Sequence, residues 1–168
     1  VWPGATRPPY RGRCGLVGGC DGILSLLTDR SDGALMDGAG PQLKVVSNMA
    51  VGYDNIDLLA ARDRGIAVGN TPGVLTETTA DLAFALMASA ARRIVEGVEH
   101  SRAGRWQTWG PKTLLGHDLH GATLGIIGFG RIGCAMARRG RGFGMRILFT
   151  DPKGNPTGAA ELGAEKRG

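Results

Sequence analysis

The stretch Ala122-Thr-Leu-Gly-Ile-Ile-Gly-Phe-Gly-Arg-Ile-Gly-Cys-Ala-Met-Ala137 predicts a short apolar strand, a glycine turn and the start of a helix. Its glycines Gly128, Gly130 and Gly133 have the G-x-G-x-x-G spacing of a dinucleotide-binding turn. In such a turn the first glycine lets the chain leave the strand sharply, the second lets a pyrophosphate approach the backbone, and the third lets the helix pack close to the strand. The N-terminus of the helix then offers free N–H groups to the phosphates.

The glycine spacing alone is weak evidence, because glycine accounts for 29 of the 168 residues. The residues around the three glycines strengthen the prediction of a dinucleotide-binding turn. The apolar run 123–127 has the length of a strand, and a second apolar run, 146–150, ends at Asp151. That acid lies about twenty residues after the turn, where a carboxylate that binds the cofactor ribose is expected. The alternatives are a glycine-rich strand–helix connection without a ligand and an exposed loop acid at Asp151.

Composition excludes several classes of protein. The formal net charge is +5, but the arginines are scattered and no aromatic residues alternate with them, so we expect solvated helix faces and no nucleic-acid partner. No apolar run approaches the length of a membrane span, so no membrane partner is expected. The three cysteines form no C-x-x-C pair, which favours a cytoplasmic protein with reduced thiols, no disulfide framework and no metal site.

The order of the predicted elements indicates the fold class. After an irregular segment at 1–13, strands are predicted within 21–28, 43–47 and 66–68, with helices at 31–38 and 54–64 between them. Alternating strands and helices imply a parallel sheet, whose ligands bind beyond the carboxyl ends of the strands. The segment 50–53 lies at one such end and is a candidate binding loop.

One long helix is predicted over 76–102, followed by a polar loop over 104–121 and then by the nucleotide-binding unit. The sequence therefore predicts an α/β protein that contains parts of two doubly wound parallel-sheet lobes joined by a long helix. Residues 1–72 would be part of one domain. Residues 73–168 would be the joining helix and the N-terminal half of a second, dinucleotide-binding domain.

Three stretches resemble the family of D-isomer-specific 2-hydroxyacid dehydrogenases, most closely its glyoxylate/hydroxypyruvate reductase branch. They are Leu43-Lys-Val-Val-Ser-Asn-Met-Ala-Val-Gly-Tyr-Asp-Asn-Ile-Asp57, Gly69-Asn-Thr-Pro-Gly-Val-Leu-Thr-Glu-Thr-Thr-Ala-Asp-Leu-Ala83 and Gly121-Ala-Thr-Leu-Gly-Ile-Ile-Gly-Phe-Gly-Arg-Ile-Gly133. The resemblance implies a flavodoxin-like substrate lobe and a Rossmann cofactor lobe. It also implies reduction of a small 2-oxo acid, such as glyoxylate or hydroxypyruvate, to the D-2-hydroxy acid with NAD(P)H.

The resemblance also assigns binding residues. It implies that the backbone N–H groups of Val51 and Gly52 bind the substrate carboxylate, although an ordinary tight turn that needs Gly52 for its dihedral angles is an alternative. Thr79 matches a position near the cofactor, or else its hydroxyl bonds to the backbone at the start of a helix. The remaining residues implied to bind the cofactor belong to the glycine turn and to the end of the second strand: Gly128, Phe129, Gly130, Arg131, Ile132, Gly133 and Asp151.

A carboxylate at Asp151 repels a 2′-phosphate, so NAD is expected in preference to NADP. Arg141 and Lys153 are close enough in the sequence to soften that preference, so NADP stays possible.

The resemblance places the catalytic Arg, Glu and His of the family in the C-terminal part of its chains. None of the three histidines here, His100, His117 and His120, matches that motif, so no catalytic residue is assigned. We therefore expect this chain to be an inactive internal fragment of a longer dehydrogenase that forms a homodimer. The alternative is a dinucleotide-sensing corepressor of the same fold, which binds but does not catalyse.

Overall fold

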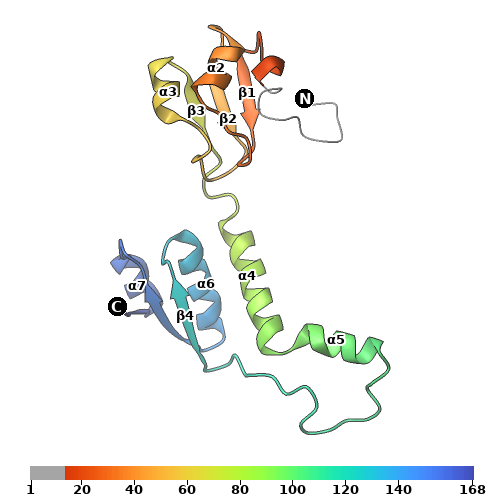
Figure 1. The fold of residues 1–168 in the computed structure, drawn as a ribbon. Coiled ribbons are helices and arrows are strands. Elements are labelled where there is room, and N and C mark those ends of the chain that lie inside the picture. The colour runs from red at the N-terminus through yellow and green to blue at the C-terminus, as the bar shows by residue number, and fades with distance from the viewer. Residues whose placement is uncertain (1–13) are drawn as a thin grey trace. The chain divides into compact units, whose positions relative to one another are not determined.

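The computed structural model describes residues 14–168, so the segment 1–13, predicted to be irregular, lies outside the described residues. The chain divides into two compact units, one ending at Val74 and the other beginning at Leu75 (Figure 1). Each unit contains its own three-stranded parallel sheet and its own hydrophobic core. The predicted α/β class is confirmed.

The first unit alternates strands with helices, as predicted. In chain order its elements are β1 (Gly22–Ser25), α2 (Gly33–Ala39), β2 (Val45–Asn48), α3 (Leu58–Asp63) and β3 (Ala67–Gly69). The sheet has the order β1-β2-β3, with Gly22 paired to Val45 and Val45 paired to Ala67. Its core contains Met36 and Val46, which are almost completely buried.

Helix α3 begins later than the sequence suggested. The predicted helix starts at Asp54, but the observed N-cap is Asp57, whose side chain accepts a hydrogen bond of 2.9 Å from the Ala60 amide. Both aspartates are suitable caps, and Asp57 is selected because its own amide is bound to the Ser31 carbonyl. The helix ends before Gly65, which has a φ of +66° and therefore suits glycine.

The second unit contains the predicted nucleotide-binding elements. In chain order these are α4 (Thr76–Ala91), α5 (Ile94–Arg102), β4 (Thr123–Ile127), α6 (Arg131–Gly142), β5 (Arg146–Thr150), α7 (Pro156–Leu162) and β6 (Glu165–Lys166). The sheet has the order β4-β5-β6. Helix α6 packs against β4 and β5 and also contacts α4 (Figure 1). The short strand β6 pairs Glu165 with Leu148.

The single long helix predicted over 76–102 is wrong, because the chain breaks at Arg92 and Arg93. Arg93 has a left-handed backbone with a φ of +53°, and α5 starts after it. The Ala91 carbonyl accepts a hydrogen bond of 2.8 Å from the His117 amide. A Cβ at Gly116 would lie only 2.3 Å from that carbonyl oxygen, so the returning chain passes very close to the break. This tertiary contact replaces the helical one.

Among the described helices, none is both long enough and apolar enough to cross a membrane.

Candidate functional site

Two of the three glycines in the turn after β4 are required by the fold itself. Gly128 has a φ of +89°, and its amide donates a hydrogen bond of 2.8 Å to the Thr150 carbonyl. A Cβ at Gly133 would lie 2.2 Å from the Gly128 carbonyl oxygen, so α6 packs against the turn only with glycine there. These two residues perform the mechanical roles that the motif predicts.

Gly130 differs from its two neighbours, because nothing in the fold requires glycine at this position. Its φ is −81°, which any residue adopts, and a Cβ there would meet no atom within 4 Å. Gly130 is also the N-cap of α6 and provides no side-chain hydrogen bond, so the first N–H groups of the helix have no cap. The open space beside uncapped N–H groups fits a phosphate group of a dinucleotide.

Asp151, at the end of β5, organises the backbone around this turn. Its Oδ2 accepts a hydrogen bond of 2.7 Å from the Phe129 amide, and its Oδ1 accepts bonds of 2.8 Å from Lys153 and 3.0 Å from Gly154. These amides, that of Phe129 first, hold the pKa of Asp151 below its usual value. The group is therefore an ionised carboxylate, and such an oxygen can accept further hydrogen bonds.

The other predicted cofactor residues lie in three different settings. The Phe129 side chain is fully buried and stacks on Phe149 with ring centroids 4.1 Å apart, so only its backbone can serve the site. Arg131 and Ile132 are exposed in the first turn of α6. Thr79 is exposed in α4, and its amide bonds to the Leu75 carbonyl at 2.9 Å. Its contact with the cofactor stays a prediction.

A cavity of about 540 Å³ opens beside the glycine turn, within the second unit. Helix α6 contributes Arg131 and Cys134 to its wall, and α4 contributes Thr76 and Glu77. Arg139 of α6 donates a hydrogen bond of 2.9 Å to Glu77, which fixes the start of α4 against α6. The wall of the cavity beside the uncapped start of α6 is therefore formed by two helices that a hydrogen-bonded ion pair joins.

Sequence reasoning missed Asn155, which ties the glycine turn to the next helix. Its Nδ2 donates a hydrogen bond of 3.0 Å to the Phe129 carbonyl, while its Oδ1 accepts one of 3.0 Å from Gly158 and so caps α7. The Asn-Pro pair at the start of α7 is the one available signal, since it is typical of a helix N-terminus. It predicts the cap but not the contact with the turn.

The predicted substrate loop follows β2 in the first unit, and the carbonyl groups of its residues 50–52 are all fixed. The carbonyl of Ala50 accepts from the Thr71 amide at 2.9 Å. The carbonyl of Val51 accepts from Asn70 Nδ2 at 2.8 Å. The carbonyl of Gly52 accepts from Asn48 Nδ2 at 2.7 Å.

Two amides of this loop, unlike its carbonyls, have no hydrogen-bond partner in the protein. Within residues 14–168, the N–H groups of Val51 and Gly52 have no protein acceptor. Gly52 lies outside the left-handed region, and a Cβ there would meet Leu27 at an ordinary distance of 3.4 Å. The dihedral angles of the turn therefore do not explain this glycine. Two neighbouring amides without protein partners are the donors that a small anion-binding site requires.

A buried hydrogen-bond network at the end of β2 holds the loop. Asn48 is fully buried at the end of β2, and its Oδ1 accepts a hydrogen bond of 2.9 Å from Ser25 Oγ. Its Nδ2 also lies 3.0 Å from Asn55 Oδ1. Because Asn48 and Ser25 are buried, the hydrogen bond between them is shielded from water and helps to fix the loop.

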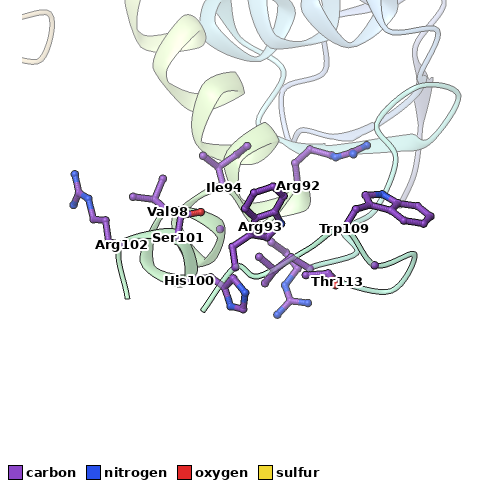
Figure 2. A pocket seen from close by; sticks show the side chains of 13 residues that line it. Arg92, Arg93, Ile94, Val98, His100, Ser101, Arg102, Trp109 and Thr113 are labelled. Carbon is purple, nitrogen blue, oxygen red and sulfur yellow. The ribbon is translucent and has the colours of Figure 1, made fainter. Parts of the chain in front are cut away.

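A second cavity, of about 610 Å³, lies on α5 and the loop that follows it (Figure 2). Its apolar wall includes Ile94, Val98 and the exposed rings of Trp106 and Trp109. Arginines also line it, among them Arg102 and Arg93, which forms an ion pair with Glu96. Aromatic residues and arginine are both enriched at protein interfaces.

Comparisons with known proteins agree with this geometry. The profile of a family described as "D-isomer specific 2-hydroxyacid dehydrogenase, catalytic domain" matches residues 14–163. A glyoxylate reductase of Korarchaeum cryptofilum is 51% identical over 166 residues, which cover 98% of this chain and 50% of that protein. A glyoxylate reductase of Thermococcus kodakarensis is 47% identical over 171 residues, which cover 99% of this chain and 51% of that protein.

A solved structure shows the same fold. The TT0316 protein from Thermus thermophilus has a TM-score of 0.88 and 44% sequence identity, and the match covers 97% of this chain and 50% of that one. The chain thus spans about half the length of the curated relatives that it matches.

Proposed function

This chain belongs to the D-isomer specific 2-hydroxyacid dehydrogenase family, and we propose that the protein reduces a small 2-oxo acid, such as glyoxylate or hydroxypyruvate, to the D-2-hydroxy acid. The observation that carries the proposal is the pair of unpartnered amides at Val51 and Gly52, in a loop whose carbonyls are all bound. Relatives named glyoxylate reductase support this choice of substrate.

The loop 50–52 binds the substrate by its carboxylate. Two N–H groups without protein partners suit the two oxygens of a carboxylate, and hydrogen bonds to an ionised acceptor are stronger than neutral ones. The bound carboxylate fixes the position of the neighbouring oxo carbon, which is the atom to be reduced. None of the described residues is proposed as the proton donor.

The second unit holds the nicotinamide cofactor, which supplies the hydride when bound. The N–H groups at the start of α6 bind its phosphates in the space beside Gly130, and Arg131 and Ile132 flank it. Asp151 accepts hydrogen bonds from the adenosine ribose. Because Asp151 stays ionised, it repels a 2′-phosphate, so we propose NAD as the preferred form even though Lys153 lies nearby.

The two units take the roles of parts of two domains. The unit that ends at Val74 provides the substrate loop, and the unit that begins at Leu75 provides the cofactor turn. We also propose that the protein forms a homodimer through the surface of α5 and the loop after it, where Trp106 and Trp109 are 61% and 77% exposed. Large aromatic side chains are enriched at the centres of protein interfaces.

The test is oxidation of NADH with and without glyoxylate by the longer dehydrogenase of which this chain is expected to be a fragment, followed at the absorbance of NADH. We expect a rate that depends on glyoxylate and saturates with it. Dinucleotide binding without any such rate, using hydroxypyruvate as well, would contradict the enzymatic function and favour the dinucleotide-sensing alternative.

A further inference from the structure

The side chain of Asn70 contacts the substrate loop. It follows β3, and its Nδ2 donates a hydrogen bond of 2.8 Å to the Val51 carbonyl. That carbonyl and the Gly52 N–H belong to one peptide group. The described chain contains no cis peptide bond, and in a planar trans peptide the C=O and N–H bonds point in opposite directions. A donor on the Val51 oxygen therefore determines where the Gly52 N–H points.

The neighbouring peptide group is fixed independently. The Ala50 carbonyl accepts from the Thr71 backbone amide at 2.9 Å, and this bond orients the Val51 N–H. Asn70 and Thr71 are adjacent, so one short segment after β3 holds both peptide groups, one through a side chain and one through the backbone. The Gly52 carbonyl is held by Asn48 and belongs to the next peptide group.

We propose that Asn70 is a positioning residue for the substrate carboxylate, which acts by holding the Gly52 N–H toward the bound anion. This inference rests on the proposed function, because it assumes that the loop 50–52 binds a 2-oxo acid. Asn70 itself does not touch the substrate in this scheme. Without its side chain the Val51–Gly52 peptide is free to rotate, since a glycine on one side of it imposes little restraint. The Val51 N–H would keep its orientation.

The test follows the NMR amide signals of Val51 and Gly52 separately. The chain contains three Val–Gly pairs, at 17–18, 51–52 and 68–69, and two Ala–Val pairs, at 50–51 and 67–68. Labelling valine with carbonyl 13C and glycine with 15N, or alanine with carbonyl 13C and valine with 15N, therefore leaves only a few amide signals from this chain. Gly18 serves as an internal reference. The probe is oxamate, in which a carboxylate lies beside a carbonyl as in a 2-oxo acid.

Titration of the protein with oxamate should shift the amide signals of both Val51 and Gly52. In Asn70→Ala the shift of Gly52 should shrink, that of Val51 should persist, and the Kd for oxamate should rise about tenfold, as expected when one hydrogen bond to a charged group is weakened. Asn70→Asp cannot donate to the carbonyl and adds a negative charge, so it should weaken binding further. Arg62→Ala, at an exposed position on α3, is the matched control and should bind like the unaltered protein.

The outcomes separate the two ideas. If Val51 and Gly52 respond in the unaltered protein but Asn70→Ala binds oxamate as tightly, or loses both shifts equally, the positioning role is wrong and the proposed function stands. If neither amide responds in the unaltered protein, the carboxylate site fails and the role of Asn70 fails with it.

Discussion

The Phe129 amide donates a hydrogen bond of 2.7 Å to Asp151 Oδ2, which joins the glycine turn after β4 to the end of β5. These residues are 22 positions apart in the sequence. The same carboxylate also binds the amides of Lys153 and Gly154, so one side chain shapes the turns after two adjacent strands. Asp151 therefore has one role within the fold, and we propose a second toward the cofactor ribose.

Replacing Asp151 should weaken both roles. Asp151→Asn keeps one acceptor oxygen but places an NH2 group against a backbone amide. We expect a lower Tm and a Kd for NADH raised by about tenfold or more, the range expected when hydrogen bonds to a charged group are lost. Thermal unfolding and fluorescence titration with NADH measure the two effects. An unchanged Kd would contradict the ribose-binding role, whatever the Tm.

The pH dependence of stability tests the same carboxylate. Its pKa in the folded chain lies below the ordinary value of 3.8, so its contribution to stability is present above pH 3.8 and is lost as the pH falls through the folded pKa. The difference in Tm between the unaltered chain and Asp151→Asn should therefore be constant near neutral pH and shrink below pH 3.8. A difference that grows on acidification would show that the sign of this pKa shift is wrong.

Gly130 and Gly133 form a matched pair for separating function from folding. Gly130→Ala places a Cβ in open space, so the free energy of unfolding should change by less than about 0.5 kcal/mol while NADH binding weakens. Gly133→Ala places a Cβ 2.2 Å from the Gly128 carbonyl oxygen and should cost about 2 kcal/mol or more. Urea unfolding and NADH titration of both variants provide the comparison. Tight NADH binding by Gly130→Ala would argue against a phosphate at this position.

The buried amide of Asn48 should matter more for stability than the exposed amide of Asn70. Asn48→Ala leaves Ser25 Oγ and the Gly52 carbonyl without a partner, which should lower the free energy of unfolding by about 2 kcal/mol. Asn70→Ala should lower it by less than about 0.5 kcal/mol, because water replaces its hydrogen bond. Equal losses in urea unfolding would contradict this difference.

The exposed tryptophans should control association. Replacing both Trp106 and Trp109 with serine removes the largest exposed rings of the surface formed by α5 and the loop after it. The sedimentation coefficient should then shift toward that of a monomer. Leu59→Ser, on the first unit, changes a residue that is 64% exposed and is the control. A dimer that survives the double replacement would place the interface elsewhere.

The sequence predicted the parts of this structure that depend on local pattern. Apolar runs located five of the six strands within residues 14–168, and the glycine spacing located the turn before α6. The break at Arg93 was missed because it depends on the approach of His117 and Gly116, which are distant in the sequence. The contact of Asn155 with the Phe129 carbonyl was missed for the same reason. The side chain of Phe129 fills the core beside Phe149, so a contact of its backbone with the cofactor stays a prediction.

In both sheets every strand pairs with the strand that comes next along the chain, as in the pairs Gly22–Val45, Val45–Ala67 and Thr123–Arg146. Within residues 14–168, no strand has to wait for a partner that is synthesised much later. The sheet of the unit that ends at Val74 can therefore form on the ribosome while the residues after it are still being added. The substrate loop is then already shaped when the nucleotide-binding turn is translated.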